Sequence, residues 1–113
     1  MKESEVNKSI KRNLRLFCPQ VVVLIRIFTG SIEVKWGGWV HGASPGTADW
    51  VAIVNNKGVA HTLFIEAKRS RGGVHSDEQK EFQHKFDGIE NVHYIVARSV
   101  HDVINYVKKL VDI

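Results

Sequence analysis

Two carboxylates and a lysine are the residues whose types and spacing best fit a chemical role in this chain. They are Asp49, which follows a glycine-containing loop, and Glu66 and Lys68, which end an apolar run. Charged groups placed beside apolar residues are costly unless they are paired or bind a metal ion. Because Glu66 and Lys68 are two residues apart, they project from the same face of a strand. The spacing therefore predicts a charged cluster at the end of a strand.

A predicted hairpin brings Asp49 to this cluster. A turn signal centred on Lys57 and Gly58 separates two strand-like runs, residues 50–54 and 60–67. With Lys57 and Gly58 as the central turn residues, Asp49 and Glu66 are equally far from the turn and lie opposite each other. The open end of the hairpin is then a candidate divalent-metal site with a lysine beside it.

The chemistry expected of such a site is hydrolysis of a phosphodiester. Mg²⁺ and Mn²⁺ prefer oxygen ligands, and Asp49, Glu66 and the Ala67 carbonyl would supply three. The cation would polarise a phosphoryl oxygen and lower the pKa of a water. Lys68 would orient that water or stabilise charge on the phosphorane, and it is a poorer candidate for a general base. The alternative is an ordinary exposed Glu-x-Lys pair on an edge strand, with Asp49 as a turn or cap residue.

The rest of the sequence predicts the elements that must position these groups. Hydrophobic periodicity and turn signals predict three helices and a set of strands. In chain order they are a helix over 4–17, strands over 20–28 and 31–36, a mobile glycine-rich loop over 37–46, the hairpin, a helix of about 77–87, a strand over 92–97 and a last helix after residue 99. Capping boxes are predicted at Ser76 with Gln79 and at Ser99 with Asp102. We expect a mixed α/β sandwich whose central sheet is covered on both faces.

Length and composition predict a single domain over residues 1–113. A net charge of +4 is compatible with a nucleic-acid partner without establishing one. No apolar run approaches the ~20 residues of a membrane span, and no signal peptide is expected. Because Cys18 is the one cysteine, no internal disulfide is possible. We therefore expect a cytoplasmic protein with no membrane association and no organic cofactor.

Three segments together resemble a known nuclease family. Gly46-x-x-Asp49, then Phe64-Ile65-Glu66-Ala67-Lys68, then a glycine loop and Ser76-x-x-Gln79 are similar to the VRR-NUC domain, a branch of the PD-(D/E)XK superfamily. The resemblance covers nearly the whole chain. It implies a restriction-endonuclease-like core in the order α-β-β-β-α-β, with a mixed central sheet flanked by helices.

The resemblance also implies roles for individual residues. The two carboxylates match the metal ligands of the family, and the lysine matches its catalytic lysine. Gln79 looks like the family's glutamine that reaches the site from the following helix. A glutamate of the N-terminal helix also approaches the metal in this family, and Glu3 fits that position better than Glu5.

Basic residues are the candidates for contacts with the DNA backbone. A charged stripe on the first helix would either follow phosphates or form a solvated face. Arg26 interrupts an apolar strand and would be either a buried ion-pair partner or a substrate contact. The loop after Lys68 is one residue longer than the usual family spacing, and its two arginines are candidates for DNA contacts. The full candidate set is Lys8, Lys11, Arg12, Arg15, Arg26, Arg69 and Arg71.

The function implied is a Mg²⁺- or Mn²⁺-dependent endodeoxyribonuclease that cuts branched DNA such as Holliday junctions. Small stand-alone members of the family, many from phages and bacteria, act as homodimers. Two alternatives remain open. One is a flap or nicking nuclease without a preference for junctions, and the other is a non-catalytic DNA-binding module that keeps the fold.

Overall fold

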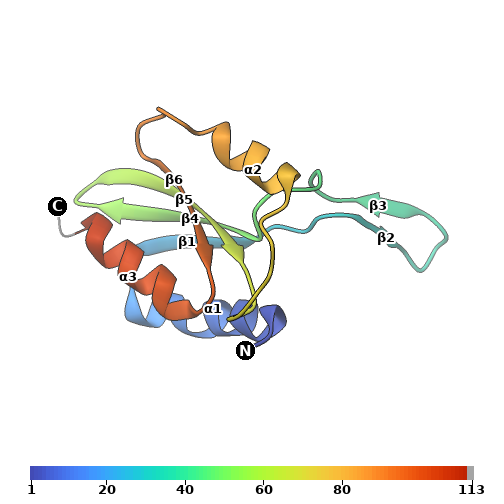
Figure 1. Cartoon of the computed structure of the whole chain (residues 1–113), viewed down its shortest axis with the longest axis horizontal. Coiled ribbons are helices and arrows are strands. Elements are labelled where there is room, and N and C mark those ends of the chain that lie inside the picture. Colours follow the sequence, from blue (N-terminus) through green and yellow to red (C-terminus); the bar gives the residue numbers. More distant parts are fainter. Residues whose placement is uncertain (112–113) are drawn as a thin grey trace.

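The computed structural model describes residues 1–111, apart from the side chains of Ile32 and Val40. Its centre is a four-stranded mixed sheet in the order β1-β4-β5-β6 (Figure 1). β1, β4 and β5 are antiparallel neighbours, whereas β6 runs parallel to β5. The strands are β1 (Val21–Arg26), β4 (Trp50–Asn56), β5 (Val59–Ala67) and β6 (Val92–Ala97). The predicted α/β class and mixed sheet are confirmed, and the last two residues of the predicted domain lie outside the described residues.

Two helices cover one face of this sheet. α1 (Glu3–Phe17) and α3 (Val100–Val111) lie side by side below it in Figure 1. α1 buries Val6, Ile10 and Leu14, which recur at helical spacing, so the predicted helix over 4–17 is confirmed and begins one residue earlier. Its buried stripe meets the apolar stripe of α3 and the inward side chains of β4 and β5. No helix within residues 1–111 is long and apolar enough to cross a membrane.

The opposite face of the sheet is covered only in part, so the predicted sandwich covered on both faces is wrong there. α2 (Asp77–His84) lies above the sheet in Figure 1. Phe82 packs edge-on against Phe64 of β5, and Phe86, just beyond the helix, stacks on the same ring. β1 lies outside this cover, and its outward-facing Val23 and Ile25 are exposed. The helix is too short to reach across the full width of the sheet.

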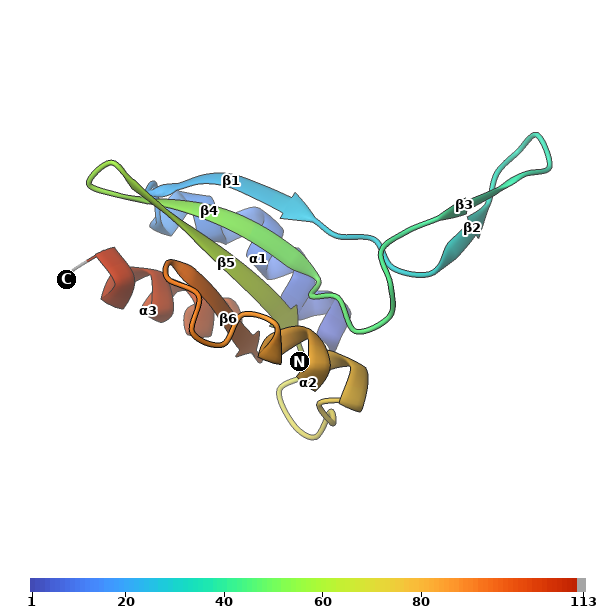
Figure 2. The same cartoon turned by 90° about the horizontal axis from the view of Figure 1, so that it is seen from above.

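The segment predicted as a strand and a mobile loop forms a projecting two-stranded arm instead. β2 (Ser31–Glu33) pairs with β3 (Trp39–His41), and the arm extends away from the sheet in Figures 1 and 2. The tip is closed by hydrogen bonds between Val34 and Gly38 and between Gly37 and Val34. The predicted strand over 31–36 therefore ends early, and part of the predicted loop over 37–46 is its returning partner. The turn of this arm runs from Val34 to Gly37, where Gly37 has a φ of 86°, and Gly38 already belongs to the returning side because its carbonyl accepts from the Val34 N–H.

The main hairpin has the predicted register. Trp50 pairs with Ile65, so Asp49 lies opposite Glu66 at the open end. Lys57 and Gly58 have φ angles of 52° and 90°, as a two-residue turn with both central residues left-handed requires. The Asn55 side chain accepts a 2.7 Å hydrogen bond from the Gly58 N–H and closes the turn. This register, rather than any single contact, sets the two carboxylates next to each other.

The two predicted helix caps differ in outcome. At α2 the capping box of Ser76 and Gln79 is present in both directions. At the start of α3, the Asp102 carboxylate accepts from the backbone N–H of Arg98, one residue before the predicted partner Ser99. The predicted capping box of Ser99 with Asp102 is therefore wrong, because the Asp102 carboxylate accepts from the N–H of Arg98 instead of that of Ser99.

Candidate metal centre and its basic surroundings

Three carboxylates converge at the open end of the hairpin. Oxygen atoms of Glu3, Asp49 and Glu66 lie within 4.8 Å of one another. They come from three elements: the first turn of α1, the residue before β4 and the end of β5. Glu3 is thus in the cluster, as the preference for Glu3 over Glu5 anticipated. This arrangement supplies an oxygen-rich site of the kind that hard divalent cations prefer.

The backbone holds Asp49 in place. The Ala67 N–H donates a 2.8 Å hydrogen bond to Asp49 Oδ2, and the Ile27 N–H donates to the Asp49 carbonyl. Because the N–H and C=O of a residue point to the same side of an extended strand, the Ala67 carbonyl faces Asp49 as well. The third ligand predicted from the sequence is therefore on the correct side of β5.

Glu66 is the most constrained of the three carboxylates, because it is only 3% exposed. Its Oε1 accepts a hydrogen bond from Gln79 Nε2 and lies 3.8 Å from Lys68 Nζ. Its Oε2 is buried and has no hydrogen-bond partner within the described chain. A buried carboxylate oxygen without a partner is costly, and a cation bound between the carboxylates would satisfy it.

Burial also raises the pKa of the Glu66 carboxyl, to about 8. The Asp49 carboxylate raises this pKa further, and the Lys68 ammonium opposes the shift. Without a cation, the folded site therefore favours a protonated Glu66 near neutral pH. Binding of a divalent cation would favour the ionised form, so affinity for the cation should increase as the pH rises.

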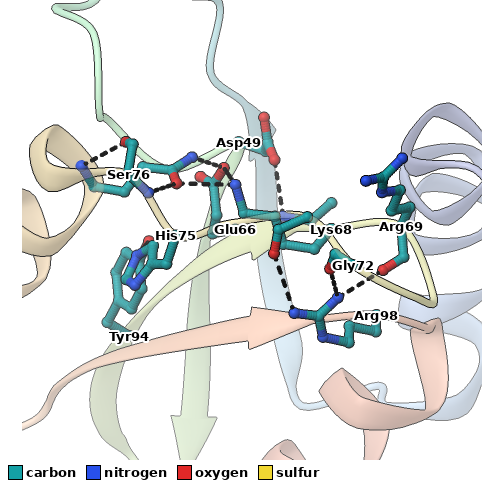
Figure 3. A network of polar contacts seen from close by, with 12 residues as sticks. Asp49, Glu66, Lys68, Arg69, Gly72, His75, Ser76, Tyr94 and Arg98 are labelled. Carbon is teal, nitrogen blue, oxygen red and sulfur yellow. Dashed lines mark hydrogen bonds and ion pairs between the residues drawn. The ribbon is translucent and has the colours of Figure 1, made fainter.

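Gln79 connects the helix cap at Ser76 to Glu66 and Lys68, three residues that are labelled in Figure 3. Its Oε1 accepts from the Ser76 N–H and from Lys68 Nζ, each at 2.9 Å, while its Nε2 donates to Glu66. Gln79 is thus the N3 residue of the capping box, and its side-chain amide also contacts Glu66 and Lys68. Lys68 is 8% exposed, and its ammonium lies between Gln79 Oε1 and the Glu66 carboxylate.

Arg26 forms an ion pair with Asp49, but it is exposed and not the buried ion-pair partner that the sequence suggested as one alternative. Its Nη1 lies 2.9 Å from Asp49 Oδ1 and donates at 2.9 Å to the Asp49 carbonyl. The guanidinium also lies 5.4 Å from the centre of the Trp50 ring. The side chain keeps 46% of its surface exposed, so the same cation remains accessible at the edge of the site.

The structure places all but one of the predicted basic residues in the lining of two hollows. The first hollow, of about 480 Å³, lies between α1 and β1 and is lined by Lys8, Lys11, Arg15 and Arg26, together with Asn7, Leu24 and Trp50. The second, of about 440 Å³, is lined by Arg69 and Arg71 with Met1, Lys2, Glu5 and Ser70. Arg12 lines neither hollow. Glu5, the rejected alternative to Glu3, lies in the second hollow.

The tryptophans occupy different environments. Trp50 is buried, and its Nε1 donates to Asn7 Oδ1 at 2.8 Å, as expected of a core residue. Trp39 lies on β3 of the arm and is 62% exposed. Trp36 is 86% exposed at the arm tip, so it is not a core residue of this chain.

Two residues near the site were not singled out by the sequence. Tyr94 of β6 shares a 3.1 Å hydrogen bond with His75, and the two rings stack beside Ser76 (Figure 3). Burial, with Glu66 and Asp49 nearby, raises the pKa of the Tyr94 phenol, which keeps it neutral. Arg98 follows β6 and contacts the loop after Lys68. The parallel pairing of β5 with β6 brings both residues here, and that pairing has no local sequence signal.

No protein-family model, curated protein or solved structure matches the chain. Its chemistry is therefore inferred from the site geometry and from the sequence pattern.

Proposed function

We propose that this chain is a Mg²⁺- or Mn²⁺-dependent endodeoxyribonuclease with a PD-(D/E)XK core of the VRR-NUC type. The observation that carries the proposal is the convergence of Glu3, Asp49 and Glu66 beside the Lys68 ammonium. These groups come from separate parts of the chain and meet at one end of the sheet. An incidental surface Glu-x-Lys pair would not require a buried glutamate and a buried lysine held by one amide.

The residues present fit a divalent cation. The buried Glu66 Oε2, which has no partner within residues 1–111, is the atom that a cation would satisfy. Asp49, Glu66, Glu3 and the Ala67 carbonyl would hold it. Such a cation would polarise a phosphoryl oxygen and lower the pKa of an attacking water.

Side chains of this protein would stabilise charge and bind phosphate during phosphodiester hydrolysis. Lys68 Nζ, held by Gln79 Oε1, would stabilise negative charge that develops on the phosphoryl oxygens. Arg26, at the exposed edge of Asp49, would bind the phosphate that flanks the cut. A phosphate entering the site would compete with Asp49 for this guanidinium and leave the carboxylate oxygen more available to the cation.

DNA is the partner that the surface around the site fits. The two basic hollows would bind backbone phosphates, which give affinity without sequence preference. Branched DNA is the substrate that the family resemblance suggests. A homodimer would supply the two symmetric cuts needed to resolve a junction. The exposed Val22, Val23 and Ile25 on the edge strand β1 support a self-association surface.

The test is cleavage by pure protein of a labelled four-way junction, a flap and a matched linear duplex, with Mg²⁺, Mn²⁺ or EDTA. We expect metal-dependent, symmetric incision of the junction and none in EDTA. Lys68→Ala and Asp49→Asn should lose at least about 100-fold in rate, as removal of a transition-state contact does, while circular dichroism stays unchanged. Lys108→Ala on α3 is the matched lysine control.

The other outcomes identify the alternatives. Equal cutting of flap and duplex would indicate a nuclease without junction preference. Salt-dependent binding without cleavage in any metal would indicate the DNA-binding module. Undiminished cleavage by Lys68→Ala would rule out the proposed site. Light scattering on the same samples measures the oligomeric state, and a monomer that cuts junctions symmetrically would contradict the dimer.

A further inference from the structure

The guanidinium of Arg98 binds three backbone carbonyls of one loop (Figure 3). Its Nη1 donates to the carbonyls of Arg69, at 2.8 Å, and of Gly72, and its Nη2 donates to that of Gly73 at 3.4 Å. No carboxylate within residues 1–111 forms an ion pair with this guanidinium. Three of the five N–H donors of this guanidinium are thus used by the backbone of residues 69–73, which we call the arginine loop.

Arg98 itself is fixed from the opposite side. It follows Ala97, the last residue of β6, which pairs with Ala67 at the end of β5. Its backbone N–H donates a 2.8 Å hydrogen bond to Asp102 Oδ2 at the start of α3. The backbone of Arg98 is therefore anchored to the sheet and to a helix, and the loop is the element that its guanidinium contacts from this fixed point.

The arginine loop needs such support. Gly72 and Gly73 have φ angles of 68° and 71°, so two consecutive residues are left-handed. Glycine adopts this conformation freely but loses more conformational entropy on ordering than other residues do. The guanidinium satisfies three carbonyls at once, and Ser70 adds a hydrogen bond to the Met1 carbonyl. Without Arg98, the carbonyls of Arg69, Gly72 and Gly73 would lose this partner, and the contacts of Ser70 with Met1 would be left to hold the loop.

The arginine loop contains Arg69 and Arg71, which line the second basic hollow. Lys68, directly before the loop, is held independently of it. Its N–H donates to the Ala97 carbonyl at 2.8 Å, and its ammonium donates to Gln79 Oε1. Loss of loop order should therefore displace the two arginines while leaving the lysine in the site.

We infer that Arg98 is a positioning residue for DNA binding: it holds the arginine loop so that Arg69 and Arg71 contact backbone phosphates. The inference rests on the proposed function, since it assumes that DNA is the substrate. A direct phosphate contact by Arg98 is the competing role. The geometry disfavours it, because the guanidinium already spans three carbonyls of the chain.

The test compares Arg98→Gln and Arg98→Lys with wild type and with Lys108→Gln as control. Binding of a labelled DNA junction is measured by anisotropy in EDTA at several salt concentrations. We expect both Arg98 variants to bind about tenfold more weakly, with a log–log salt slope less steep by about 2, the slope carried by two phosphate contacts. In Mg²⁺, KM should rise while kcat stays within about twofold, since Lys68 remains held.

Three results would overturn the inference while the wild type still cuts DNA. Full rescue by Arg98→Lys would mean that charge alone matters, because an ammonium cannot bridge the three carbonyls as a planar guanidinium does. A fall in kcat at unchanged KM would mean that Arg98 acts through Lys68. Additivity with the double variant Arg69→Ala/Arg71→Ala would show that Arg98 does not act through these arginines.

Hydrogen exchange separates failure of the inference from failure of the proposed function. Amides of residues 70–74 should exchange faster in Arg98→Gln than in wild type without DNA, and unchanged exchange would overturn the clamp itself. A wild-type protein that binds no DNA would instead overturn the proposed function, and the DNA role of the arginine loop with it.

Discussion

The raised pKa of Glu66 leads to a stability prediction that needs no substrate. Glu66→Gln replaces the carboxyl with a neutral amide of the same shape, whose oxygen can still accept from Gln79 Nε2. In the folded chain the carboxyl has a pKa of about 8, against 4.5 for an unperturbed glutamate. That difference corresponds to roughly 5 kcal/mol, an upper limit because water entering the site would relieve part of the cost.

The direction in which stability changes with pH follows from how many protons the folded and the unfolded chain bind. Between pH 4.5 and about 8 the unfolded chain loses the Glu66 proton while the folded chain keeps it. Stability from this group is therefore fully present below pH 4.5 and is lost as the pH rises to about 8. The amide cannot ionise, so Glu66→Gln should lack this loss. The variant should become progressively more stable relative to wild type between these two pH values.

The assay is urea unfolding in EDTA at pH 4.5, 6, 7 and 8.5, followed by circular dichroism, with the exposed Glu90→Gln as control. We expect a wild-type-to-variant difference that grows by several kcal/mol with pH for Glu66→Gln and stays flat for Glu90→Gln. Added Mg²⁺ at pH 8.5 should stabilise wild type and not Glu66→Gln. A difference that is the same at every pH would refute the burial argument.

Two further predictions concern positions away from the carboxylates. A Cβ on Gly46, which has φ +90°, would lie 2.5 Å from the Glu78 backbone, whereas Gly30 has φ +89° and open space around it. Gly30→Ala should cost about 1–2 kcal/mol of backbone strain and Gly46→Ala clearly more, measured by thermal unfolding; equal costs would contradict the close approach. Burial, and then the nearby His61, lower the pKa of His93 below 6.5, and His93 also shares a 2.8 Å hydrogen bond with the Tyr106 hydroxyl. The contribution of His93 to stability should therefore fall as the pH drops below 6.5, opposite in sign to that of Glu66, so His93→Gln should become more stable relative to wild type between pH 7.5 and pH 5; an unchanged difference between the two proteins in urea unfolding at these pH values would refute this.

Local signals predicted the parts of the site that depend on local geometry. The turn at Lys57 and Gly58 sets the hairpin register, and with it the approach of Asp49 to Glu66. The Ser76 capping box predicted where α2 begins and therefore where Gln79 lies. Both rest on contacts between residues close in sequence, which is why pattern reasoning reached them.

Features that depend on contacts between residues distant in sequence could not be predicted from local patterns. The approach of Arg98 to the loop after Lys68 depends on parallel pairing between β5 and β6, which are joined through α2. The returning strand of the arm is not distinguishable in sequence, because three strand residues that follow Gly37 and Gly38 look the same as part of a glycine-rich loop. Incomplete cover of the sheet depends on the length of α2, which ends at His84 before the predicted residue 87.

The hairpin register also links the position of the charged cluster to the packing of the apolar core. Side chains alternate along β5, so Leu63 and Ile65 are buried among the core residues while Glu66 and Lys68 project to the other face. A slip of one residue would exchange these faces, placing a carboxylate and an ammonium in the apolar core. The cost of burying those charges, added to the loss of the apolar contacts, strongly disfavours the slipped pairing. The turn at Lys57 and Gly58, far from the carboxylates in space, is therefore among the determinants of the site, because it selects the register that brings Asp49 to Glu66.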